Sequence, residues 1–218
     1  QTCALPISGL IAGVVNGLII SVRKINDFIV TLGMLSIAAG TALVLSNGRP
    51  VQIINSGLAN VAINEKFGVP YLMYIAFAIV LFSHFLLFHT RFGVHLLAVG
   101  GDPDSARAMG VSIVKIKVAV YGISGLLAGF AATLAIARIG AAEPAANTAI
   151  LLNSVAAVVL GGVSLFGGRA TIFGPFVATL LLQALSNGLT IIGVASYYQY
   201  ISVGIVVILS ASLVRNVR

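Results

Sequence analysis

The chain has 218 residues, of which 59% are hydrophobic and only 8% are charged. Soluble domains carry about 25% charged residues, and the mean hydropathy of this chain is +1.11. These values exclude a soluble enzyme, a disordered chain and a disulfide-stapled secreted domain, so they indicate an integral membrane protein. Because a spanning helix needs about 20 apolar residues, the length predicts about six to seven spans joined by short loops.

The net charge is +7, and the chain contains a single cysteine, Cys3. We attribute the positive charge to cytoplasmic loops, where Lys and Arg accumulate. Nucleic-acid binding is not expected, because the sequence has no basic run and no basic face interleaved with aromatic residues. One cysteine excludes an internal disulfide and a cysteine-based metal site.

The octapeptide Gln1 to Ser8 resembles the translation of a common sequencing-adapter oligonucleotide. We therefore interpret residues 1–8 as non-native and residues 9–218 as a single transmembrane domain. A natural helix start after an upstream break is the alternative. In both cases the chain begins inside an apolar segment, and we expect an N-terminally truncated fragment.

Continuous apolar runs predict spanning helices, because the strands of a membrane barrel would alternate apolar and polar residues. The glycines of the fifth segment allow a broken or re-entrant helix instead of a full crossing. The resulting fold class is all-α, a polytopic transmembrane helix bundle. The seven predicted segments are Gly9 to Val22, Phe28 to Ser46, Tyr71 to Phe88, Val118 to Ala137, Ile150 to about Phe166, Ile172 to Leu189, and Tyr198 to Val214.

The basic residues predict the orientation of these spans. If the turn after the first segment is cytoplasmic, alternation places nine basic residues inside and three outside, as the positive-inside rule requires. The loop 89–117 and the C-terminus are then cytoplasmic, and the loop 47–70 is periplasmic. The inner set is Arg23, Lys24, Arg91, Arg107, Lys115, Lys117, Arg169, Arg215 and Arg218, and the outer set is Arg49, Lys66 and Arg138.

Small residues recur at four-residue spacing in two of the predicted helices. They are Gly9, Gly13 and Gly17 in the first, and Gly125, Gly129 and Thr133 in the fourth. Such stripes let helix backbones approach closely. We interpret them as tight packing inside the bundle, with a seam between two subunits as the alternative.

The sequence contains no catalytic constellation, and we predict neither a metal site nor a cofactor. His84, His89 and His95 do not share a helical face. The spans contain no Asp or Glu that could relay protons, which argues against a secondary transporter. The glycines from Gly161 to Gly168 lack the Lys and Ser/Thr of a phosphate-binding loop. We therefore expect the chain not to hydrolyse ATP. We interpret this stretch as a flexible bend between two helix halves, which is either buried in protein or lines a cavity, and so as a candidate part of the pathway.

The loop 89–117 contains a predicted short helix. Asp102 is a favourable N-cap, Pro103 suits the first helical position, Asp104 complements the positive helix end, and Gly110 closes the helix. A helix of about two turns is unstable in water by itself, so it must dock onto the bundle or onto a cytoplasmic partner.

This region resembles permease subunits of ABC importers of the ribose and monosaccharide type. Asp104-Ser105-Ala106 followed by Gly110 has the spacing of the family's Glu-Ala-Ala-x3-Gly motif, although the downstream Leu-Pro is absent. The resemblance covers nearly all of residues 9–218. The other similar stretches are Asn16 to Leu18, Asp27 to Met34, Val155 to Gly168, Asn187 to Leu189, and Ser196 to Gln199.

The resemblance implies a permease in the bacterial inner membrane that translocates a monosaccharide. Its implied partners are an ATPase subunit, a periplasmic sugar-binding protein, and a second permease copy or paralogue. The resemblance also implies that the short helix docks into the ATPase and that further N-terminal spans are missing. A permease for a branched-chain amino acid or an autoinducer, and a self-contained channel or secondary carrier, are the alternatives. The residues implied to couple to the ATPase are Asp102, Pro103, Asp104, Ser105, Ala106, Arg107, Ala108, Met109 and Gly110.

Two further sets of residues are functional candidates. Uncharged polar groups in or beside the spans could hydrogen-bond sugar hydroxyls in a translocation path, or could instead bond between helices. Outer charges could dock the binding protein, or could be ordinary solvated loop charges. The path candidates are Asn16, Asn153, Ser154, Gln183 and Asn187, and the docking candidates are Arg49, Glu65, Lys66, Arg138 and Glu143.

Overall fold

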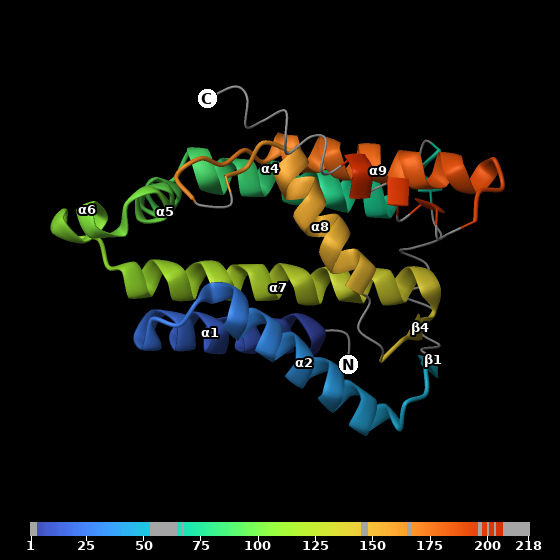
Figure 1. Ribbon diagram of the computed structural model, residues 1–218, viewed down its shortest axis with the longest axis horizontal. Helices are drawn as coiled ribbons and strands as arrows, with labels where there is room; N and C mark the ends of the chain where they lie inside the picture. The colour runs from blue at the N-terminus through green and yellow to red at the C-terminus, as the bar shows by residue number, and fades with distance from the viewer. Residues whose placement is uncertain are drawn as a thin grey trace. The chain divides into compact units, whose positions relative to one another are not determined.

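The computed structural model describes residues 4–52, 65–66, 68–144, 148–164, 167–195, 198–199, 201–202 and 204–206 (Figure 1). The chain forms two compact units. The first comprises Gln1–Ile79 and Asp104–Ala146, and the second comprises Val80–Pro103 and Asn147–Arg218. Five helices among the described residues are long and apolar enough to cross a membrane. The predicted all-α membrane bundle is therefore confirmed.

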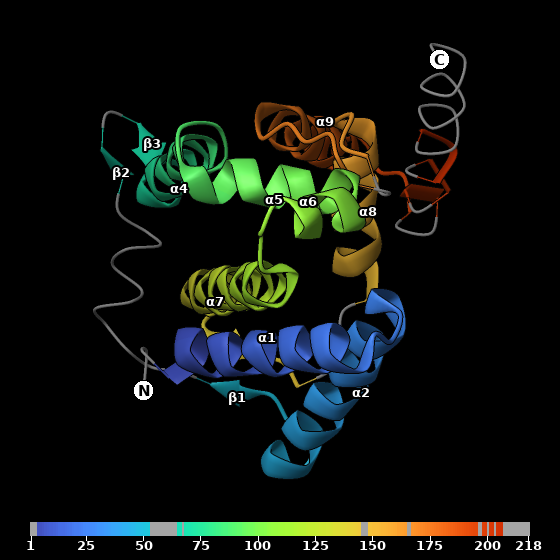
Figure 2. The ribbon, with the colours of Figure 1, turned by 90° about the vertical axis from the view of Figure 1, so that its left-hand side faces the viewer.

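The first unit is organised around helices α1 (Ala4–Arg23) and α7 (Ile113–Ile139), which lie side by side in both ribbon views (Figures 1 and 2). A Cβ added at Gly17 would lie 2.8 Å from the Cα of Val118, and one added at Gly13 would overlap the carbonyl oxygen of Tyr121. Gly9 meets Gly125 in the same way, so the two helices run antiparallel. The predicted glycine stripes therefore pack against each other inside one chain.

Helix α2 (Asp27–Ser46) follows α1 after a short turn and contacts it. Its N-cap is Asn26, whose side chain accepts a hydrogen bond from the N–H of Phe28 at 2.9 Å. Its C-terminus is closed by Asn47 in the left-handed conformation, with a φ of 51°. None of its residues is buried within the first unit, as expected of a helix that faces lipid or a partner.

A short antiparallel pair of strands joins the ends of α2 and α7. Strand β1 (Val51–Gln52) follows α2, and β4 (Ala141–Ala142) follows the Gly140 turn that ends α7. Val51 pairs with Ala142 and Gln52 with Ala141. The C-terminal ends of α2 and α7 therefore lie at the same end of the first unit, as the predicted topology requires. A second pair, β2 (Glu65–Lys66) with β3 (Val69–Pro70), precedes α4 (Tyr71–Phe88), and α4 leads into the second unit.

The second unit contains α5 (Arg91–Gly101), α8 (Thr148–Leu160) and α9 (Phe173–Ile191). Helices α8 and α9 pack through small residues, and the carbonyl of Gly161 contacts Gly174 closely. The Thr171 hydroxyl donates to that carbonyl at 3.0 Å. One buried cluster of this unit consists of Ala156, Ala157, Ala178 and Leu182, with Leu160 and Val206 packed against it.

The predicted spans agree with the helices in most places. Helices α1, α2, α4, α7 and α9 occupy the first, second, third, fourth and sixth predicted segments. The fifth segment is interrupted as its glycines predict, because α8 ends at Leu160 and Gly162 turns the chain with a φ of 78°. Thirteen residues span about 20 Å, too short to cross the hydrocarbon core alone. The seventh segment lies largely outside the described residues.

Helix α5 is not predicted from the sequence, because residues 89–101 belong to the predicted loop 89–117. Thr90 is its N-cap, and the Thr90 hydroxyl oxygen accepts from the N–H of Gly93 at 3.3 Å. Gly93, Gly100 and Gly101 make the segment look irregular, but each of them lies against backbone of another segment. Close packing therefore requires the glycines that lower the helix propensity of this segment.

Candidate functional site

The short helix predicted in the loop between the third and fourth apolar segments is present as α6 (Pro103–Ala108). It ends where Gly110 adopts a φ of 83°. The Gly110 N–H donates to the Arg107 carbonyl at 2.9 Å, and the Val111 N–H donates to the Ala106 carbonyl at 3.0 Å. This pair of bonds is a Schellman motif. The predicted start at Pro103 and the predicted glycine stop are thereby confirmed.

Helix α6 and Met109, the residue that follows it, expose charged and apolar side chains to solvent. Arg107 and Asp104 form an ion pair at 3.5 Å, and their side chains are 63% and 91% exposed. Met109 is 72% exposed, whereas Ala106 is only 1% exposed. Surface ion pairs of this kind contribute little stability. This ion pair therefore does not by itself explain why so short a helix forms.

In the second unit, the end of α5 contacts the glycine-rich loop between α8 and α9. A Cβ at Gly100 would lie 3.3 Å from the backbone nitrogen of Gly168, and one at Gly168 would lie 3.1 Å from the Cα of Gly101. Gly167 and Gly168 both have positive φ values, 93° and 77°. The stretch interpreted above as a flexible bend is thus in backbone contact with the residues just before Pro103.

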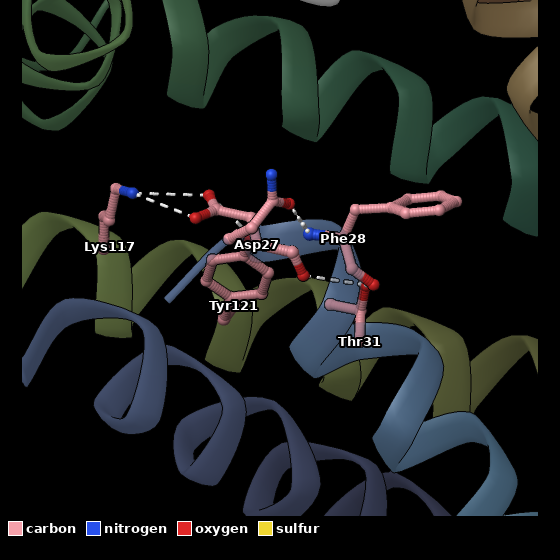
Figure 3. A network of polar contacts seen from close by, with 6 residues as sticks. Asp27, Phe28, Thr31, Lys117 and Tyr121 are labelled. Atoms are coloured by element: carbon pink, nitrogen blue, oxygen red, sulfur yellow. Dashed lines mark hydrogen bonds and ion pairs between the residues drawn. The ribbon is translucent and has the colours of Figure 1, made fainter. Parts of the chain in front are cut away.

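In the first unit, Asp27 joins the start of α2 to the start of α7 (Figure 3). Lys117 Nζ lies 3.3 Å from both carboxylate oxygens of Asp27. The Tyr121 hydroxyl donates to Asp27 Oδ2 at 3.0 Å. Lys117 and Tyr121 are four residues apart and so lie on the same face of α7. We refer to Asp27, Lys117 and Tyr121 as the Asp27 cluster.

The Asp27 cluster is not among the residues selected from the sequence. The clue that the sequence offers is a carboxylate at the margin of one span together with a Lys and a Tyr, four residues apart, at the start of another. That spacing identifies a helical face but not the partner of that face. Asp27 and Lys117 come together because α1 packs against α7 and a short turn after α1 leads directly into α2.

The path candidates belong to different units and make local contacts. On α1, Asn16 has a buried Oδ1 without a hydrogen-bond partner in the described part of the chain. Ser154 donates to the Ile150 carbonyl of its own helix at 2.7 Å. Gln183 donates to Asn187 at 3.3 Å, one turn further along α9. Asn153 is exposed on α8. In the described part of the chain, the hydrogen bonds of Ser154, Gln183 and Asn187 given above therefore lie within single helices rather than between helices.

Three of the docking candidates flank the β1–β4 pair. Arg49 precedes β1, Arg138 lies in the last turn of α7, and Glu143 follows β4, and all three are exposed. Glu65 and Lys66 form β2, and their side chains lie outside the described part of the structure. The three described candidates thus share one end of the first unit.

The sequence matches the family described as branched-chain amino acid transport system / permease component over residues 3–211. The chain belongs to this family. Every helix described above lies within the matched range. No solved structure matches the chain.

Sugar permeases are among the curated proteins to which the chain is similar. The chain is 40% identical over 215 residues to the ribose import permease protein RbsC of Escherichia coli K12, covering 95% of this chain and 66% of the relative. It is 36% identical to the RbsC protein of Bacillus subtilis strain 168, covering 92% and 63%. It is 33% identical to the L-arabinose ABC transporter permease protein AraH of Azospirillum brasilense, covering 94% and 60%. The chain thus spans just under two thirds of the length of these relatives.

Proposed function

We propose that the chain, through residues 9–218, acts as the membrane-spanning permease subunit of an ATP-driven importer for a monosaccharide of the ribose type. One observation carries this proposal: a short exposed helix, α6, closed by Gly110, lies in the connection between the apolar helices α4 and α7 of a chain that is 40% identical to a ribose import permease. The L-arabinose and ribose relatives favour a sugar over a branched-chain amino acid or an autoinducer.

ATP hydrolysis belongs to a separate subunit in this proposal. Helix α6 has only six residues, which is too short for stability in water without a docking partner. Its exposed ion pair and Met109 suit a groove that combines polar and apolar contacts. The residues from Asp102 to Gly110 would bind the ATPase, whose closure on ATP would displace α6 and alternate the access of the pathway.

The charges of the first unit support the proposed orientation in the inner membrane. Arg23 and Lys24 lie at the end of α1 and Lys115 and Lys117 at the start of α7, the end at which the Asp27 cluster forms. Arg49 and Arg138 lie at the opposite end. The first end is the more basic and is assigned to the cytoplasm. The C-terminal tail is assigned to the same side.

The pathway and the outer surface follow from that orientation. The path would use Asn16, whose Oδ1 lacks a described partner, together with Asn153, Ser154, Gln183 and Asn187. A sugar hydroxyl would satisfy such a buried acceptor. The exposed charges around β1 and β4 would dock the periplasmic binding protein. A second copy of the chain or a paralogue would complete the channel.

The proposal is tested by uptake into vesicles that contain the chain and its ATPase subunit, with the purified binding protein added. We expect uptake of radiolabelled ribose or a related monosaccharide only when ATP and the binding protein are present. Leucine is the competing solute for the amino-acid alternative. Uptake of leucine in place of sugar, or sugar uptake without ATP and ATPase, contradicts the proposal.

A further inference from the structure

The two α7 members of the Asp27 cluster, Lys117 and Tyr121, follow closely after α6 along the chain. Only residues 109–112 separate α6 from α7, and Lys117 is the fifth residue of α7. At 1.5 Å per residue, Lys117 lies about 6 Å along the axis from the start of α7. Displacement of α6 therefore acts first on the part of α7 that holds Asp27.

The neighbours of α7 are attached to it in different ways. Helix α1 packs on α7 along three glycines, so that these backbones must move together. Helix α2 has no buried residue, and no described atom lies within 4 Å of a Cβ added at Gly33 or Gly40. At its starting end, α2 is held to α7 by the three contacts of Asp27.

We propose that Asp27 is a positioning residue for transport, which makes α2 follow α7 when α6 is displaced. This inference rests on the proposed function. With Asp27 in contact with Lys117 and Tyr121, the starts of α2 and α7 move as one body. Without these contacts, α7 and α1 move but the start of α2 does not follow them. ATP is then hydrolysed without the pathway opening fully to the other side of the membrane.

The competing explanation is that the Asp27 cluster only stabilises the fold. The solvent exposure of its side chains distinguishes this explanation from a role in transport. The side chains of Lys117 and Asp27 are 32% and 49% exposed. Ion pairs with this much contact with solvent contribute little to stability. Removing the carboxylate charge should therefore affect coupling much more than folding.

The first experiment measures the attachment of α2 to α7 directly in the isolated chain. Spin labels replace the exposed residues Ile29 on α2 and Val114 on α7 in a Cys3→Ser background. We expect a narrow distance distribution in the otherwise unchanged protein and a broad one with Asp27→Asn. Thr31→Val is the matched control, because the Thr31 hydroxyl bonds only to carbonyls of its own helix in the described structure. Equal distributions in the Asp27→Asn and parent proteins overturn the proposal.

The second experiment measures coupling in the reconstituted transporter. Asp27→Asn and Lys117→Met should each lower sugar uptake per ATP hydrolysed about fivefold, the lower end of usual coupling energies. Basal ATP hydrolysis and thermal stability should be unchanged. The exchange Asp27→Lys with Lys117→Asp should restore at least half of the lost uptake. Normal uptake by the single variants, or no recovery by the exchange, overturns the proposal.

The two experiments separate failure of this inference from failure of the proposed function. If the unmodified protein shows no ATP-dependent sugar uptake, the proposed function fails. The spin-label measurement then still decides whether Asp27 attaches α2 to α7, because it requires neither the ATPase nor a substrate.

Discussion

Replacing Gly13 by Ala should destabilise the first unit, whereas the same replacement at Gly40 should not. A Cβ at position 13 would overlap the carbonyl oxygen of Tyr121 and lie 2.9 Å from its carbonyl carbon and 3.2 Å from the Cα of Gly122. These atoms are backbone of a continuous helix and cannot rotate away. Helices α1 and α7 must therefore separate, at a cost of about 1–3 kcal/mol typical of overpacking.

Gly40 provides a control with the same chemical change. No described atom lies within 4 Å of a Cβ at this position, and Gly40 lies inside α2. Only helix propensity then changes, which favours Ala over Gly by about 1 kcal/mol. Gly13→Ala and Gly40→Ala should thus shift the free energy of unfolding in opposite directions.

The assay is reversible unfolding of the purified protein in detergent micelles, followed by helical circular dichroism against increasing denaturant. At about 2 kcal/mol, the destabilisation by Gly13→Ala should also lower the melting temperature by roughly 4–8 °C. Gly9→Ala and Gly125→Ala should show non-additive costs when combined, because both act on one contact. The reasoning is refuted if Gly13→Ala is as stable as Gly40→Ala.

Three further substitutions test the surroundings of α6 and the end of α8. Gly110→Ala forces an alanine to a φ of 83° and should cost about 1–2 kcal/mol locally, weakening ATPase co-purification, while Gly110→Asn should be tolerated better. Arg107→Ala removes an exposed ion pair and should leave the melting temperature unchanged while weakening ATPase binding in a pull-down; a clear loss of stability would contradict this. Gly161→Ala places a Cβ 2.6 Å from Pro175 Cδ and should destabilise the α8–α9 packing, visible as faster proteolysis, whereas Gly188→Ala on α9 meets open space and should not.

The long apolar helices are predictable from sequence because their length and composition determine them. Helix α4 has the predicted bounds, Tyr71–Phe88, and α2 begins one residue before the predicted Phe28. Helix α7 begins five residues before the predicted Val118. The predicted segment begins only after the charged Lys115 and Lys117. Helix α7 includes both residues, because their long side chains can reach out of the apolar zone.

Local chemistry also predicts the two ends of α6 correctly. A proline at the first helical position and a glycine after the last turn act within a few residues, so no tertiary information is needed. Helix α5 cannot be predicted from such local signals. Its glycines at 93, 100 and 101 lower local propensity, and only contacts with Leu87, Gly167 and Gly168 explain why they are required.

The candidate site is only partly predictable, for the same reason. The sequence identifies Asp104 and Gly110, which belong to a local motif. It does not identify Asp27 as a partner of Lys117, because 90 residues separate them. In such a chain, the hydrophobic pattern does not determine which spanning helices are neighbours, since each spanning helix is apolar on most of its surface.

The neighbours of α2 illustrate how such a chain can fix a helix without burying it. Helix α2 contacts α1 but has no buried residue in the first unit, so burial within this unit contributes little to its position. Polar contacts act at its two ends instead: the Asp27 cluster where it starts and the β1–β4 pair just after it stops. Both contacts lie at the margins of apolar segments, where water is available and the desolvation of charged groups is small. The long middle of α2 is then left for lipid or for a second polypeptide, and its open glycines Gly33 and Gly40 would permit either. Because two separate contacts define the direction of α2 relative to α7, loss of Asp27 alone should release the starting end of α2 and leave its other end attached.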